Sequence, residues 1–130
     1  MILVDTTVWI DFFSGRDTHQ VSLLSDIIEQ KQELCICGII LTEVLQGIRN
    51  SREHDTVQKL FNSLIFMEME KETFLLAAEI YRSLRLRGIT VRKTLDCMIA
   101  SIAIEHKIPL LHHDRDFDPI KKYCGLAVVN

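Results

Sequence analysis

Residues 110 to 120 read LLHHDRDFDPI, and three carboxylates stand at alternate positions of this stretch, beginning at Asp114. Carboxylates that stand this close together in the sequence are suitable ligands for a hard divalent cation. A self-contained calcium loop of the EF-hand type is excluded, because its sixth position requires Gly and its twelfth requires Glu. Counted from Asp114, those positions hold Pro119, which cannot adopt a positive φ, and Gly125. Any other ligands of a metal here must come from distant segments of the chain.

Further acids stand where predicted helices follow predicted strands. Asp5 directly follows the first apolar run, and Glu43 and Asp96 fall in the first turns of two later helices, behind the predicted caps Thr42 and Thr94. Each acid taken singly is explained by helix capping or by the helix dipole. Two carboxylates about 4 Å apart, however, repel by ~4 kcal/mol at an effective dielectric of about 20. A cluster of them therefore requires protonation or a cation, and a ligand set of oxygen atoms alone favours Mg²⁺ or Mn²⁺ over zinc.

Short apolar runs alternate with amphipathic segments along the whole chain, which predicts a single α/β domain over residues 1–130 with a mainly parallel sheet flanked by helices on both faces. The ligand cleft of such a sheet lies beyond the carboxyl ends of its strands. The acids at Asp5, Glu43, Asp96 and Asp114 are therefore expected on one rim. The predicted strands are 1–4, 33–39, 63–69, 108–111 and 126–129, and the predicted helices are 6–15, 20–32, 43–48, 52–64, 71–87, 95–107 and a short one within 116–123.

Composition sets limits on the kind of protein. The chain is 48% hydrophobic, yet no stretch approaches the ~20 apolar residues of a membrane span, and the N-terminus lacks a signal peptide pattern, which predicts a cytoplasmic protein with no membrane partner. The four cysteines form no C-x-x-C pair, so we expect free thiols rather than a zinc site. The net charge is −3, but basic residues gather at 82–93 and at 121–122, either as solvated helix faces or as contacts for a phosphate backbone.

The four acidic segments together resemble the signature segments of the PIN domain family, and most of all those of the VapC-type toxins of bacterial toxin–antitoxin pairs. These segments are VDTTVWIDFF at the N-terminus, LTEVLQG at 41–47, LDCMIASIA at 95–103 and LLHHDRDFDPI at 110–120. The resemblance implies an endoribonuclease that depends on Mg²⁺ or Mn²⁺ and cleaves transfer RNA or another structured RNA. It also implies a homodimer and a cognate antitoxin protein that inhibits it.

The resemblance also assigns roles to residues. It places the catalytic acids at Asp5, Glu43, Asp96 and Asp114, with Asp116 as an additional member. We expect Asp5, Asp96 and Asp114 to hold the metal, as one or two ions.

Neighbouring residues are expected to support the acids. Arg92 and Lys93 are expected to hold flanking phosphates of the RNA. Thr7 keeps the hydroxyl group that the family often supplies as Ser. His112 stands where a small hydroxyl residue is frequent, and it is expected, with His113, to line the cleft or to support RNA contact or proton transfer rather than to bind the metal.

Other α/β folds with acidic pockets fit less well. A phosphotransfer receiver needs an Asp after its third strand, and the stretch SLIFMEME offers only Glu. A dehalogenase-type phosphatase needs D-x-D after the first strand, and here Asp5 is followed by Thr6 and Thr7. The alternative that stays open is a catalytically silent PIN-like module that binds RNA or protein.

Overall fold

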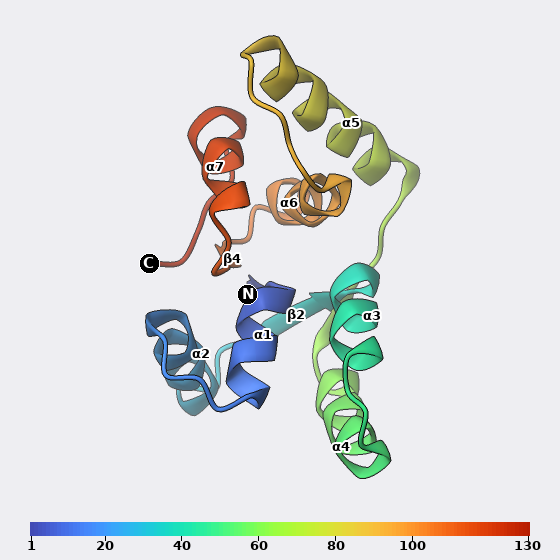
Figure 1. The fold of residues 1–130 in the computed structure, drawn as a ribbon, viewed down its shortest axis with the longest axis vertical. Helices are drawn as coiled ribbons and strands as arrows, with labels where there is room; N and C mark the ends of the chain where they lie inside the picture. The colour runs from blue at the N-terminus through green and yellow to red at the C-terminus, as the bar shows by residue number, and fades with distance from the viewer.

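The computed structural model describes all residues 1–130, and its centre is a four-stranded parallel sheet (Figure 1). The strand order is β3-β2-β1-β4, and every neighbouring pair is parallel. The first strand therefore lies between the second and the fourth, although the fourth follows it by about a hundred residues. The strands are β1 (Ile2–Val4), β2 (Leu34–Cys37), β3 (Ile65–Met67) and β4 (Leu110–Leu111).

Helices connect the strands and cover the sheet. Figure 1 shows α5, α6 and α7 on one side of the strands and α1 to α4 on the other. The most extensive contact between helices joins α5 to α6, and α7 packs on α5 as well. The helices are α1 (Thr6–Phe13), α2 (His19–Glu29), α3 (Gly38–Gln46), α4 (Ser51–Asn62), α5 (Lys71–Leu86), α6 (Thr94–His106) and α7 (Asp118–Cys124), with a short 3₁₀ helix η1 (Arg115–Phe117) before the last.

The core forms where the sheet meets its helices. Every residue of β1, β2 and β4 is buried, as expected of parallel strands covered on both faces. The helix α6 is buried on nearly all sides from Cys97 to Ala103, which explains its strongly apolar sequence. On the other side Trp9 is fully buried and packs edge-on against Phe61 of α4 at 5.1 Å between ring centroids. This packing fixes α1, and with it the residues at the end of β1.

Three sequence-based expectations about elements are wrong. Residues 126–129 do not form a strand; they make a single parallel bridge, Leu110 to Val128, at the edge of β4. Thr94 does not cap α6, because it is already the first residue of that helix, and the N-cap Lys93 makes no side-chain capping hydrogen bond. The helix α3 begins at Gly38, directly after β2, and the Thr42 hydroxyl donates to the Gly38 carbonyl at 2.8 Å instead of capping the helix. Glu43 therefore lies in the second turn of α3, because residues 38–39, expected to end the strand, already belong to the helix.

The remaining expectations about elements are confirmed within a few residues at each boundary. The sheet is parallel, and its helices follow the predicted order. All four cysteines are free thiols, and three of them are buried. None of the helices is both long enough and apolar enough to cross a bilayer.

Candidate functional site

The predicted acids all lie on elements that start at the carboxyl ends of the strands or next to them. Asp5 follows β1 and caps α1, and Asp114 follows β4 after two histidines and caps η1. Asp116 lies within η1, and Asp96 lies in the first turn of α6. Glu43 projects from the second turn of α3. Capping explains why Asp5 and Asp114 are tolerated locally, since a carboxylate at an N-cap accepts hydrogen bonds from free backbone N–H groups.

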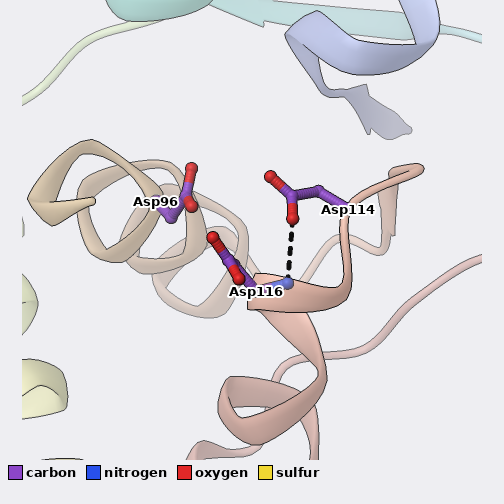
Figure 2. A group of neighbouring side chains, drawn as sticks. All are labelled: Asp96, Asp114 and Asp116. Carbon is purple, nitrogen blue, oxygen red and sulfur yellow. Dashed lines mark hydrogen bonds between the residues drawn. The ribbon is translucent and has the colours of Figure 1, made fainter. Parts of the chain in front are cut away.

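Three of the acids converge on one point. Asp96, Asp114 and Asp116 each offer a carboxylate oxygen, and these oxygens all lie within 4.8 Å of one another. Figure 2 shows Asp96 reaching out from α6 toward the other two, which stand on the β4–η1 segment. The backbone N–H of Asp116 donates to Asp114 Oδ1 at 2.9 Å, which fixes the turn between these two acids. The acid cluster, as we call these three residues, thus joins two segments that are 18 residues apart in sequence.

Asp5 and Glu43 are not members of that group of three; the charge of Asp5 acts on Asp96, and the charge of Glu43 acts on Asp5. The Thr7 hydroxyl donates to Asp5 Oδ2 at 2.6 Å, and the Thr7 N–H donates to the same oxygen at 3.2 Å. The Thr6 hydroxyl donates to Glu43 Oε1 at 2.8 Å. The first turn of α1 therefore positions both acids through consecutive threonines, and the supporting contact expected of Thr7 is present.

Electrostatic effects tie Asp5 to the acid cluster. Burial raises the pKa of the Asp5 carboxyl, although hydrogen bonds from Thr7 oppose the shift, and the charge of Glu43 adds to it. Burial also raises the pKa of Asp96, followed by repulsion from Asp5 and Asp114, to about 7. Asp96 is 6% exposed and Asp5 is 3% exposed. Acids that perturb one another in this way form one electrostatic unit.

The residues present fit a divalent cation. Two carboxylate oxygens of the acid cluster, Asp96 Oδ2 and Asp116 Oδ2, are buried and have no hydrogen-bond partner. A buried polar atom left unpaired costs about 1–3 kcal/mol, and a charged one costs more. A cation with oxygen ligands would satisfy both atoms and would offset the repulsion among the acids. The absence of sulfur and imidazole from the donor set favours Mg²⁺ or Mn²⁺.

Arg92 and Lys93, the two residues predicted to contact RNA, lie against the acid cluster. Arg92 donates to Asp116 Oδ1 at 2.8 Å, and the Lys93 ammonium lies 3.5 Å from Asp114 Oδ2. These contacts raise the pKa of both basic groups, so both carry their charge at neutral pH. Their side chains are 77% and 60% exposed, so each also faces solvent beside the acids. Sequence reasoning missed the ion pairs, since it placed these residues on flanking phosphates.

The two histidines differ in their contacts. His112 Nδ1 accepts the Asp114 N–H at 3.2 Å, and its ring packs on Phe117 with 4.9 Å between ring centroids. Burial lowers the pKa of His112, so its neutral form is favoured. The His113 N–H donates to the Thr7 hydroxyl at 3.1 Å, and His113 Nδ1 lies 3.2 Å from Asp11 Oδ2. Both residues therefore support the β4–η1 segment, as expected of residues that line the cleft.

Asp11 had no predicted role. It is 9% exposed, and it contacts His113 and Arg16. The signal for it was present in the sequence, because Asp11 follows Thr7 by four residues and so shares its face of α1.

Two depressions adjoin the acids. A polar one of about 490 Å³ lies outside Asp114 and has no apolar residue in its lining. A second one of about 510 Å³ lies between α3, α5 and α6, reaches Glu43, and is mostly apolar. The polar depression is lined by Gln20, Arg92, His112, His113, Asp114, Arg115 and Asp118, and the apolar groove by Gly38, Ile39, Thr42, Glu43, Gln46, Met69, Phe74, Leu95 and Met98.

Comparison with known proteins gives consistent results. The PIN domain family model matches residues 2–123. Ribonuclease VapC11 of Mycobacterium tuberculosis is 34% identical over 132 residues, which cover 100% of this chain and 98% of that protein. The structure of VapBC2 from Rickettsia felis bound to a DNA fragment superposes with a TM-score of 0.75 at 18% identity, covering 100% of this chain and 98% of the other. VapBC-1 from nontypeable Haemophilus influenzae gives the same TM-score, identity and coverage. These two structures share the fold of this chain.

Proposed function

The chain belongs to the PIN domain family, and from that premise we propose that it is an endoribonuclease, the toxin of a toxin–antitoxin pair, that depends on Mg²⁺ or Mn²⁺. Its substrate is RNA, with transfer RNA or another structured RNA as the class to test first. The observation that carries the proposal is the acid cluster, with its two unpaired buried oxygens, in a chain whose full-length relative is a ribonuclease.

Asp96, Asp114 and Asp116 would hold the metal, with Asp5 beside them and Glu43 as a further acid. A bound divalent ion there lowers the pKa of a coordinated water and neutralises charge on a phosphodiester. Thr7 and Thr6 keep Asp5 and Glu43 in place through their hydroxyl groups.

The exposed cations beside the acids bind the substrate. The Arg92 guanidinium and the Lys93 ammonium lie at the edge of the acid cluster, where they can contact phosphates on either side of the cleaved bond. Both are mostly exposed, so an approaching RNA strand can reach them without a change in the fold.

Cleavage of total cellular RNA tests the proposal. Purified protein, free of antitoxin, is incubated with Mg²⁺ or Mn²⁺ and with EDTA, beside Asp5→Asn and the control Asp26→Asn, an exposed acid of α2. We expect discrete metal-dependent products from the wild type and from Asp26→Asn, and none from Asp5→Asn. Asn conserves the shape of Asp5, so a loss of cleavage would show that the negative charge of Asp5 is required. Products from Asp5→Asn equal to those of the wild type would contradict the assignment.

Intact RNA under every condition would favour the alternative, a silent module that binds RNA or protein. The five acids argue for the enzyme, because a silent module has no need for clustered buried carboxylates, which repel one another. An RNA-binding measurement on the same samples separates the two, since the module would bind RNA and never shorten it.

The apolar groove is a candidate surface for assembly. Phe74 and Leu95, which line it, are 46% and 41% exposed, and Leu75, next to Phe74 in sequence, is 59% exposed. Exposed apolar residues gathered at one place are typical of protein interfaces. We assign this groove to a homodimer and the polar depression beside Asp114 to a segment of the antitoxin. Phe74→Glu should convert the dimer to a monomer in analytical ultracentrifugation, and a wild-type protein that is already monomeric at micromolar concentration would refute the dimer.

A further inference from the structure

Two basic runs that are separate in the sequence meet on one surface of the structure. Arg87 is the C-cap of α5, whereas Lys122 and Tyr123 stand in the last turn of α7. The Arg87 guanidinium lies 4.2 Å from the centroid of the Tyr123 ring, and Lys122 Nζ lies 5.2 Å from the same centroid. We call Arg87, Lys122 and Tyr123 the basic–aromatic surface.

Helix packing holds this surface together. The helices α5 and α7 contact one another, and the Ser83 hydroxyl lies 3.7 Å from the Cys124 sulfur, next to Tyr123 in sequence. Figure 1 shows the end of α5 approaching α7 at the same side of the molecule. The surface is therefore set by the fold and does not depend on the chance orientation of single side chains.

The charges of the surface are not neutralised by the protein. Arg87 and Lys122 take part in none of the ion pairs of the structure, whereas Arg82, earlier in α5, pairs with Glu79 at 3.0 Å. Favourable interaction with the helix dipole explains a cation at each helix end. It does not explain why cations from two helices share one aromatic ring that is 39% exposed. Unpaired cations around an exposed aromatic ring suit a partner with phosphates and stacking bases.

The surface is close to the acid cluster along the chain. Arg87 precedes Arg92, the partner of Asp116, by five residues. The helix α7 begins two residues after Asp116, and Tyr123 lies about 7.5 Å along the helix axis from its first residue. A strand of nucleic acid, at about 3.4 Å per nucleotide, extends over such a distance within a few nucleotides.

We propose that the basic–aromatic surface is a second RNA-binding site, where Arg87 and Lys122 contact the phosphate backbone and Tyr123 stacks on a base. The inference rests on the proposed ribonuclease function, and it extends the RNA contact of Arg92 and Lys93 along α7. RNA is favoured over an acidic protein segment because α7, which carries Tyr123, begins two residues after Asp116, and because an exposed aromatic ring stacks on any base.

Binding of a fluorescein-labelled single-stranded RNA of mixed sequence, followed by anisotropy, tests this inference. The protein carries Asp5→Asn so that the probe stays intact, and the salt concentration is varied. We expect Arg87→Gln/Lys122→Gln to reduce the slope of log affinity against log salt by about 1.4, since each lost phosphate contact of a single strand contributes about 0.7. Tyr123→Leu should weaken binding by about fivefold or more, while Tyr123→Phe, which keeps the ring, should bind as the parent does.

The matched control is Arg52→Gln/Lys59→Gln, which removes two exposed cations from α4 and should leave the salt slope unchanged. Thermal melting of every variant verifies that it is folded. Unchanged slope and affinity in Arg87→Gln/Lys122→Gln and in Tyr123→Leu would overturn the inference, and the surface would then suit an acidic protein segment. Cleavage by the wild type is measured in parallel, so that a failure of the proposed function, with no cleavage and no binding, is recognised separately.

Discussion

Removal of one candidate metal ligand should stabilise the protein when no metal is present. Asp96 is 6% exposed, its Oδ2 has no partner, and its pKa is raised from 3.8 to about 7 by burial and by the charges of Asp5 and Asp114. The folded state therefore keeps a proton that the unfolded state has lost between these two pH values. The contribution of Asp96 to wild-type stability is fully present below about pH 4 and is lost as pH rises through about 7.

The magnitude follows from the shift. Roughly three pKa units correspond to ~4 kcal/mol at 1.36 kcal/mol for each unit. The acid cluster faces solvent on the side of Arg92 and Lys93, so screening reduces the penalty by about half. The Asn variant also loses the favourable interaction of a negative charge with the first turn of α6, which lowers its stability by about 0.3–1 kcal/mol. We therefore expect Asp96→Asn to raise the free energy of unfolding by about 1–2 kcal/mol at pH 8 in EDTA, and by close to zero at pH 4.5.

Urea denaturation followed by circular dichroism measures this difference at both pH values. The control is Glu72→Gln, an exposed acid in the first turn of α5, which should lower stability slightly at pH 8 and by less at pH 4.5, where glutamate is partly protonated. An Asp96→Asn protein that is no more stable than the wild type at pH 8 would refute the reasoning. An equal gain at both pH values would show that packing, and not charge, is responsible.

Three further outcomes are expected. Mg²⁺ or Mn²⁺ at about a hundred times its dissociation constant should stabilise the wild type by ~2.7 kcal/mol, seen as a higher melting temperature, and an unchanged melting temperature would argue against the metal site. Arg92→Gln/Lys93→Gln should bind Mn²⁺ severalfold more tightly in calorimetry without RNA. The Arg92 and Lys93 side chains pair with the candidate metal ligands Asp116 and Asp114 at 2.8 and 3.5 Å and so compete with the metal. Weaker binding would contradict this. Thr7→Val removes the hydroxyl that joins Asp5 to the His113 N–H, and it should lower the free energy of unfolding by about 1–3 kcal/mol in urea denaturation. Thr7→Ser should lower it much less. Equal losses in the two variants would show that the hydroxyl is not responsible.

Much of the fold was predictable because its signals are local. Buried parallel strands have short, uniformly apolar sequences, and Gly88 and the basic residues before it mark the end of α5, as predicted. The errors fell where local signals conflict with packing. Residues 126–129 have a strand-like sequence but find only one partner residue, Leu110, at the edge of a two-residue strand. Thr42 has a capping side chain, yet it lies inside a helix that begins four residues earlier.

The acids themselves were identified from the sequence, since residue type and position after a strand require no knowledge of distances. Which of them meet was decided by tertiary structure. Asp116 joins Asp96 and Asp114 because η1 turns its carboxylate back toward α6, while Asp5 stands beside them. Whether a given carboxylate points toward another depends on how α6 and η1 pack, and sequence spacing does not report that angle.

The same division holds for the cations and for the residues that support the acids. The sequence determined that basic residues gather at 82–93 and 121–122 and that Thr7 and two histidines flank the acids. Only the tertiary structure paired Arg92 with Asp116, brought Arg87 to Tyr123, and placed Asp11 against His113, 102 residues away. The physical reason is that helix and strand formation depends on neighbours within a few residues, whereas contacts between side chains on different elements depend on the packing of the whole core.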